Sequence, residues 1–217
     1  MKKTLWPRAG PFAFAVLCFF PSLALSRDST RVINTCLLND EDFPADREKI
    51  EYVFNETSSE FEARVQIKFR AVDYGVFKAR LHLYLNADST TVGNYLSEAQ
   101  KICSDSTEVI IIFSSSEAIS TDGKRRGIWG EVPFNQGLVV VYEFNYVFSR
   151  RDRSGTNASV TNLKHELGHL FIPDLHFGEK SFMFTRSADS FGRWTSGVIK
   201  AILENKYARW PLSKPPN

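Results

Sequence analysis

The segment HELGHLFIPDLH, residues 165–176, holds three of the four histidines in a chain of 217 residues. His165 and His169 are four residues apart, so their side chains lie on one face only if the segment forms a helix. On a helix their imidazoles can bind one metal ion, because one turn fixes their separation. A second face of the same helix carries leucines that can anchor it in a hydrophobic core, namely Leu163, Leu167 and Leu170.

Glu166 follows the first histidine and lies beside the metal-binding face of the predicted helix. Its carboxylate cannot easily join the two histidines as a ligand, but it can reach a water molecule on the ion. Zinc lowers the pKa of its bound water to about 7, and the carboxylate can take the proton as the water attacks a carbonyl and later pass it to the leaving amine. HExxH therefore predicts two zinc ligands and a general base. A chance arrangement on a polar helix face is the alternative, and the low histidine content disfavours it.

A catalytic zinc ion ordinarily has a third protein ligand and one open position. Proline cannot continue a helix, so the Ile172-Pro173 pair ends the predicted one. The chain can then turn back and bring His176 to the ion. Asp174 in the same turn is an alternative ligand, and so is an acidic residue on a later helix, such as Glu204. We favour His176, because it matches the other two ligands chemically.

Residues 1–26 have the features of a secretory signal peptide. Basic residues precede an apolar run over 12–20, and the small residues Ala24 and Ser26 place the cleavage after Ser26. The run is too short to span a bilayer and is followed by Pro21, which disfavours a membrane anchor. We therefore expect a secreted or periplasmic protein with no stable membrane anchor after cleavage.

Cleavage after Ser26 removes three basic residues from the 27 Lys and Arg of the chain, which leaves 24 against 25 Asp and Glu and a net charge of −1. This balance does not indicate nucleic-acid binding. About 190 residues remain, which suits one domain with a real core. We predict a single domain over 27–210 and a disordered tail over 211–217, and we expect a monomer.

Two cysteines, Cys36 and Cys103, follow the predicted cleavage site. In an oxidising compartment they most simply form one disulfide. The alternative is that Cys36, close to the new N-terminus, covers the metal and blocks it. Nothing in the sequence around Cys36 supports such a latch.

Hydrophobic patterning predicts strands that alternate with helices along the mature chain. Segments 107–113 and 138–144 are apolar enough for buried strands. Segment 127–133 is short and ends in proline, which suits an edge strand. Strict alternation over 61–72 predicts a strand with one wet face. Further strands are expected over 31–38 and 79–85, and helices over 44–55, 91–103, 160–171 and 190–207. The arrangement indicates an α/β or α+β domain.

HELGH and the later segment SFMF, which contains Met183, resemble the metzincin metalloproteases. Their motif is HExxHxxGxxH, followed by a methionine-bearing turn beneath the metal. The strand order 107–113, 127–133, 138–144 before the zinc helix is also similar to theirs. The resemblance implies a zincin-like domain: a twisted mixed sheet with an antiparallel edge strand, an active-site helix and a C-terminal helix. It further implies one catalytic Zn²⁺ ion, a Met-turn at Met183, and an extended substrate along the edge strand.

Two departures place the chain in a divergent branch, nearer to archaemetzincin-like or minimal secreted proteases than to matrixins or astacins. Ile172 replaces the family glycine, and the third histidine comes one residue late. Thr185 stands where some metzincins carry a zinc-binding tyrosine, so no tyrosine ligand is expected. By the same resemblance 127–133 would form the substrate rim, where Trp129 is either a substrate contact or a packing residue.

The leading interpretation is a secreted zinc-dependent endopeptidase that hydrolyses protein or peptide substrates with water activated by Glu166. One alternative is an exported structural or binding protein whose zinc only stabilises the fold. Another is a zinc amidase that acts on a non-protein or cell-wall peptide. Glu166 disfavours the structural alternative, because a structural site needs no base beside an open metal position. Basic loops at 124–126 and 150–153 would favour acidic substrates if both flanked the cleft.

Overall fold

The computed structural model describes residues 29–78, 89–119, 124–125, 127–133, 136–173, 175–178, 180–183 and 192–210. The predicted signal peptide, the strand expected over 79–85 and the tail over 211–217 lie outside these residues, as do Asp174 and Thr185. Among the described helices, none is long and apolar enough to cross a membrane.

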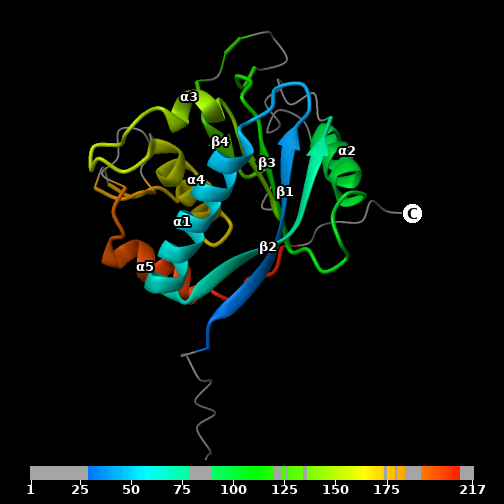
Figure 1. Cartoon of the computed structure of the whole chain (residues 1–217). Helices are drawn as coiled ribbons and strands as arrows, with labels where there is room; N and C mark the ends of the chain where they lie inside the picture. Colours follow the sequence, from blue (N-terminus) through cyan, green and yellow to red (C-terminus); the bar gives the residue numbers. More distant parts are fainter. Residues whose placement is uncertain are drawn as a thin grey trace, which may run out of the picture.

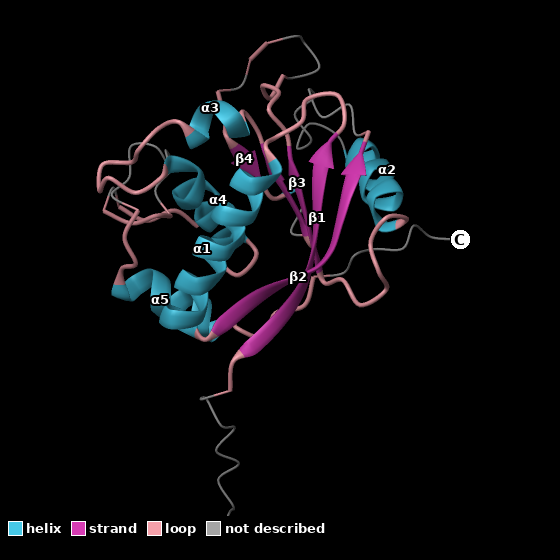
Figure 2. Ribbon diagram, viewed as in Figure 1, coloured by secondary structure: helices cyan, strands magenta, loops and turns pink. Residues whose placement is uncertain are grey.

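The described strands form one mixed sheet in the order β2-β1-β3-β5-β4 (Figures 1 and 2). β1 pairs in parallel with β2 and β3, and β3 pairs in parallel with β5, whereas β4 pairs antiparallel with β5. This confirms the predicted α/β fold with an antiparallel strand at one edge. The strands are β1 (Arg31–Asp40), β2 (Ile67–Phe77), β3 (Val109–Phe113), β4 (Gly130–Glu131) and β5 (Leu138–Val141).

Helices cover both faces of the sheet, as Figure 1 shows. On one side lie α1, α4 and α5, and on the other lies α2. The helices within the described residues are α1 (Arg47–Val65), α2 (Ser89–Gln100), α3 (Phe144–Phe148), α4 (Ala158–His169) and α5 (Ser196–Glu204). The helix predicted over 190–207 is confirmed, but it is shorter than predicted. It begins at Ser196, because Thr195 caps its first turn through a hydrogen bond from Val198 N.

Side chains of β3 and β5 divide the core into two layers, because successive residues of a strand point to opposite faces. Ile111 and Val139 pack toward α1 and α4, whereas Ile110 and Leu138 pack on the opposite face with Leu96 of α2. Both strands are buried on both faces, which is why their sequences are apolar throughout.

The strand expected over 61–72 is wrong in its first part. α1 continues to Val65, and Gln66 ends it in the left-handed conformation at φ 55°, while its N–H donates to Glu62 O. Phe61 and Val65 are buried on the inner face of α1. Residues four positions apart satisfy a strand period of two and a helix period of 3.6 alike, so the pattern over this short segment fitted both.

Cys36 on β1 and Cys103, just after α2, form a disulfide with their Cα atoms 5.8 Å apart. The predicted pairing is therefore confirmed. It ties the end of α2 to the centre of the sheet. Cys36 is fully buried in this bond, so it is not available to cover a metal.

Candidate metal centre

Helix α4 is a buried helix that packs against α1, α3, β4 and β5. Asn157 caps it, and its side chain accepts a hydrogen bond of 2.9 Å from Ser159 N. Leu163 and Leu167 are fully buried in the core between the helices and the sheet. The apolar face of the HELGH segment therefore fixes the direction in which its histidines point.

The structure brings His165, His169 and His176 together at the C-terminal end of α4. One ring nitrogen from each lies within 4.8 Å of the other two, and the Nε2 atoms of His165 and His169 are 3.1 Å apart. Zn–N distances are about 2.0–2.1 Å, so three nitrogens at such separations fit one ion after small side-chain adjustments. His165 is buried and His176 is exposed, which leaves the cluster open to solvent on one side. Three imidazoles are a donor set that suits zinc.

His165 is held by a hydrogen bond between its Nδ1 atom and the carbonyl oxygen of Phe182, at 2.9 Å. A carbonyl only accepts, so Nδ1 carries the proton and Nε2 keeps its lone pair for a metal. Burial lowers the pKa of His165 to about 3, with a further contribution from the charge of His169. The imidazole is therefore neutral at ordinary pH, which is the form that binds metal.

The turn after α4 brings His176 back toward the helix. Ile172 N–H still bonds to Gly168 O, and past Pro173 the N–H of Phe177 donates to Met183 O at 2.8 Å. This last bond places His176 next to the segment that contains Met183. The alternative ligand Glu204 does not belong to the cluster. Its exposed carboxylate lies 3.8 Å from Lys200 on α5.

Met183 is fully buried and packs directly against α4. A Cβ atom placed on Gly168 would lie 2.3 Å from Met183 Sδ and 3.1 Å from Phe182 Cε2. The glycine of HELGH thus makes room for the methionine beneath the histidine-bearing turn. Sequence reasoning identified Met183 but not the requirement for glycine at 168.

Glu166 lies on the side of α4 that faces β4 and is only 5% exposed. Burial raises the pKa of its carboxyl well above the usual range, and the nearby charge of Glu131 adds to this effect. Glu131 is itself buried on β4 and accepts a hydrogen bond from the Tyr142 hydroxyl. Sequence reasoning missed Glu131, although it is the one charged residue in the segment 127–133.

The basic loops 124–126 and 150–153 would favour acidic substrates only if both flanked the cleft, and one residue of each already has a partner. Arg125 contacts Glu143 at 2.8 Å and Glu117 at 3.2 Å. Arg150 stacks on the ring of Tyr146, with its guanidinium carbon 4.3 Å from the ring centroid. These contacts give no support to an acidic substrate.

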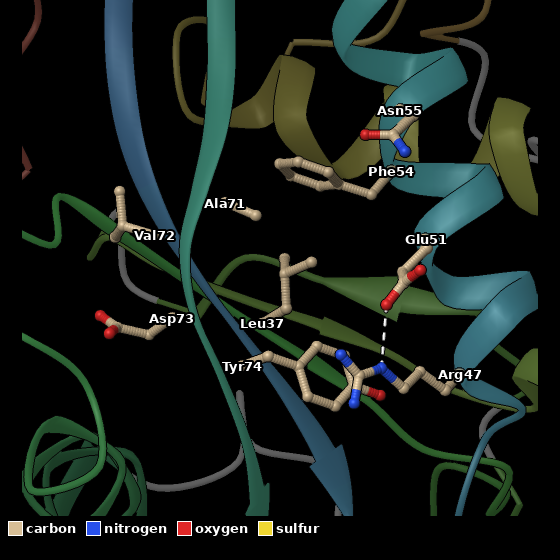
Figure 3. Close-up of a pocket in the computed structure, with 9 residues that line it drawn as sticks. All are labelled: Leu37, Arg47, Glu51, Phe54, Asn55, Ala71, Val72, Asp73 and Tyr74. Carbon is tan, nitrogen blue, oxygen red and sulfur yellow. Dashed lines mark hydrogen bonds and ion pairs between the residues drawn. The ribbon is translucent and has the colours of Figure 1, made fainter.

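A cavity of about 340 Å³ lies between α1 and β2, and Figure 3 shows the side chains that line it. Arg47 lies over the ring of Tyr74 at 4.3 Å and bonds to Glu51 at 2.9 Å. None of the three clustered histidines lines this cavity, and neither does Glu166. It is therefore separate from the candidate metal centre.

The fold is similar to that of solved metallopeptidases. An archaemetzincin from Methanopyrus kandleri superposes with a TM-score of 0.54 at 13% identity, over 80% of this chain and 95% of that one. Metalloproteinase-II from Bacteroides fragilis superposes with a TM-score of 0.52 at 13% identity, over 82% of this chain and 54% of that one. No family model matches the sequence, and no curated protein matches it significantly. At this identity the likeness shows a metallopeptidase-like fold.

Proposed function

We propose that this protein is an exported zinc-dependent endopeptidase of metzincin type. The proposal rests on the cluster formed by the imidazoles of His165, His169 and His176. The buried carboxylate of Glu166 lies on α4 between the first two histidines and does not belong to the cluster. The Cys36–Cys103 disulfide fits export to an oxidising compartment. The metallopeptidase-like fold agrees with this reading.

In the proposed mechanism, His165, His169 and His176 would hold one zinc ion, with Met183 packed beneath them. Zinc supplies a Lewis acid and lowers the pKa of a bound water to about 7. Glu166 takes the proton from the attacking water and returns it to the leaving amine. The substrate lies along β4 as an added strand.

A structural zinc site is the less favourable alternative. Burying a carboxyl group costs free energy unless that group is paired or hydrogen-bonded. In a purely structural site, burial of the Glu166 carboxyl group against β4 would destabilise the fold and serve no function. An aliphatic side chain at position 166 would fill the same space more stably.

The test is Glu166→Ala in the exported protein. We expect the variant to keep its zinc and its fold and to lose hydrolysis by at least about 10²-fold, as is usual for a positioned proton-transfer group. Zinc content is measured by elemental analysis, and hydrolysis by mass spectrometry of a digested peptide library. Glu204→Ala, an exposed glutamate on α5, is the matched control. Near-normal hydrolysis by Glu166→Ala would remove this residue from the mechanism.

A zinc-loaded wild-type protein that cleaves no library peptide would contradict the endopeptidase itself. It would favour either the structural site or an amidase with a non-protein substrate. Digestion of cell-wall peptides under the same conditions separates those two outcomes.

A further inference from the structure

Position 130 on the edge strand carries no side chain at the place where the Glu166 carboxylate lies. A Cβ atom placed on Gly130 would be 2.5 Å from Glu166 Cγ and 2.7 Å from both Cδ and Oε1. Real Cβ atoms essentially never approach so closely. Gly130 is held in the sheet opposite Val141 of β5, so its backbone cannot simply move away.

A second contact fixes the position of α4 along the edge strand β4. Asn162 lies one turn before Glu166 on α4 and is only 1% exposed. Its Nδ2 atom donates to the carbonyl oxygen of Trp129 at 2.8 Å. The same oxygen accepts a bond of 2.8 Å from Tyr142 N, just after β5. The carbonyl group of Trp129 thus connects α4 with the segments that carry β4 and β5.

These contacts share a geometric consequence. The hydrogen bond from Asn162 fixes α4 relative to Trp129. Gly130, the next residue on the strand, then lies against the carboxylate of Glu166, one helical turn after Asn162. The Glu166 side chain has three rotatable bonds, and enclosure between α4 and the β4 backbone removes most of its rotamers. A carboxylate confined in this way is held in one place before the substrate arrives.

We propose that Gly130 and Asn162 are positioning residues for the general base: the bare backbone at 130 accommodates the Glu166 carboxylate, and the Asn162–Trp129 bond sets the register that brings the two together. The inference rests on the proposed function of Glu166. Neither residue touches the reacting atoms in this scheme. A misplacement of the base by about 1 Å can cost roughly 10²-fold in rate, so the register matters for catalysis.

Gly130→Ala in the zinc-loaded exported protein is the direct test. We expect kcat to fall by at least about 10-fold, with little change in KM and none in zinc content, because the base moves while the metal ligands remain. Gly93→Ala on α2 is the matched control, because an added Cβ there meets no atom within 4 Å. Wild-type kcat in Gly130→Ala overturns the proposal.

Carbodiimide labelling of carboxylates, mapped by mass spectrometry, gives a readout that does not depend on activity. We expect Glu166 to be protected in the wild type and in Gly93→Ala, and to become modified in Gly130→Ala. Asp40 is fully buried at the end of β1 and reports whether the fold persists. Glu166 that stays protected in a folded Gly130→Ala protein overturns the proposal, whatever its activity.

Asn162→Leu tests the same positioning if Gly130→Ala does not fold. It removes the bond to Trp129 but leaves that carbonyl its partner at Tyr142 N. We expect a fall in kcat of about 10-fold with zinc retained, and an unchanged kcat contradicts the role of Asn162. Hydrolysis that survives Glu166→Ala is a different result, because it overturns the proposed function itself.

Discussion

The Nδ1 atom of His165 lies 2.9 Å from the carbonyl oxygen of Phe182, a residue 17 positions further along the chain. The N–H of Phe182 in turn donates to Arg193 O at 3.0 Å. The orientation of the first histidine therefore depends on a segment that follows the metal helix. The same segment carries Met183, so one short stretch of chain both supports the helix and fixes the tautomer of its histidine.

The first prediction concerns the late histidine. His176→Ala should weaken zinc binding by more than the roughly 10–100-fold typical of losing a partner outside the ligand set, and it should abolish hydrolysis. Asp174→Ala should do much less. Zinc affinities of both variants are measured by competition with a chromophoric chelator. If only Asp174→Ala loses the metal, the third ligand is the aspartate.

The second prediction concerns the glycine of HELGH. Gly168→Ala should lower the free energy of unfolding by about 1–3 kcal/mol, because the new methyl group overpacks the core against Met183. Gly93→Ala, also in a helix but with no atom within 4 Å of the added Cβ, should instead be neutral or stabilising by up to about 1 kcal/mol. Chemical denaturation of both variants measures the difference. Equal stability of the two would contradict the packing shown here.

The third prediction concerns the disulfide between Cys36 and Cys103. The exported protein, denatured without reductant, should contain no free thiol. Replacing both cysteines by alanine should lower the free energy of unfolding by about 2–4 kcal/mol, chiefly because the unfolded chain gains freedom. Two titratable thiols in the exported protein would show that the bond does not form there.

The fourth prediction concerns an ion pair that joins α1 to α4, between the buried Lys164 and the partly exposed Glu60. Lys164 Nζ is 2.7 Å from Glu60 Oε2 and 2.8 Å from Gly192 O, and Trp194 Nε1 donates to the same carboxylate oxygen at 2.8 Å. Glu60→Ala should destabilise the fold by about 3 kcal/mol, because it leaves the Lys164 ammonium buried without its counter-charge.

The double variant Glu60→Ala, Lys164→Met is the control for this ion pair. It should recover part of the loss, because no charge is then left unpaired in the core. Denaturant unfolding of the two single variants and the double variant gives the coupling between the residues. Additive effects would mean that the pair does not act as a unit.

The fifth prediction concerns acid. The N–H of Ser104 donates to Asp73 at 2.8 Å, and this bond, followed by the Ser104 side chain, lowers the pKa of Asp73 below its usual value of 3.8. A carboxyl with a lowered pKa in the folded state stabilises the fold above the unfolded pKa, and the contribution is lost as the pH falls through the folded value. Asp73→Asn should therefore be less stable than the wild type at pH 7. The stabilities of the two proteins should converge as the pH falls through the folded-state pKa of Asp73, as measured by thermal unfolding across pH.

The sequence by itself determined the features that depend on near neighbours in the chain. The spacing of His165 and His169 places both on one face of any helix, whatever surrounds it. The apolar runs of β3 and β5 predicted buried strands, and the proline-ended segment around β4 predicted a short edge. Composition alone also favoured the disulfide, because two cysteines remain after the predicted cleavage.

Tertiary structure decided what depends on residues far apart. The end of α1 was misread because Phe61 and Val65 satisfy helical and strand periods equally, and only packing against the core selects one. The approach of Gly130 to Glu166 follows from the order β3-β5-β4 and from α4 lying across it. Periodicity reports which side chains share a face of one element. It carries no information on which residue of another element lies opposite, because that depends on how the whole chain crosses the sheet.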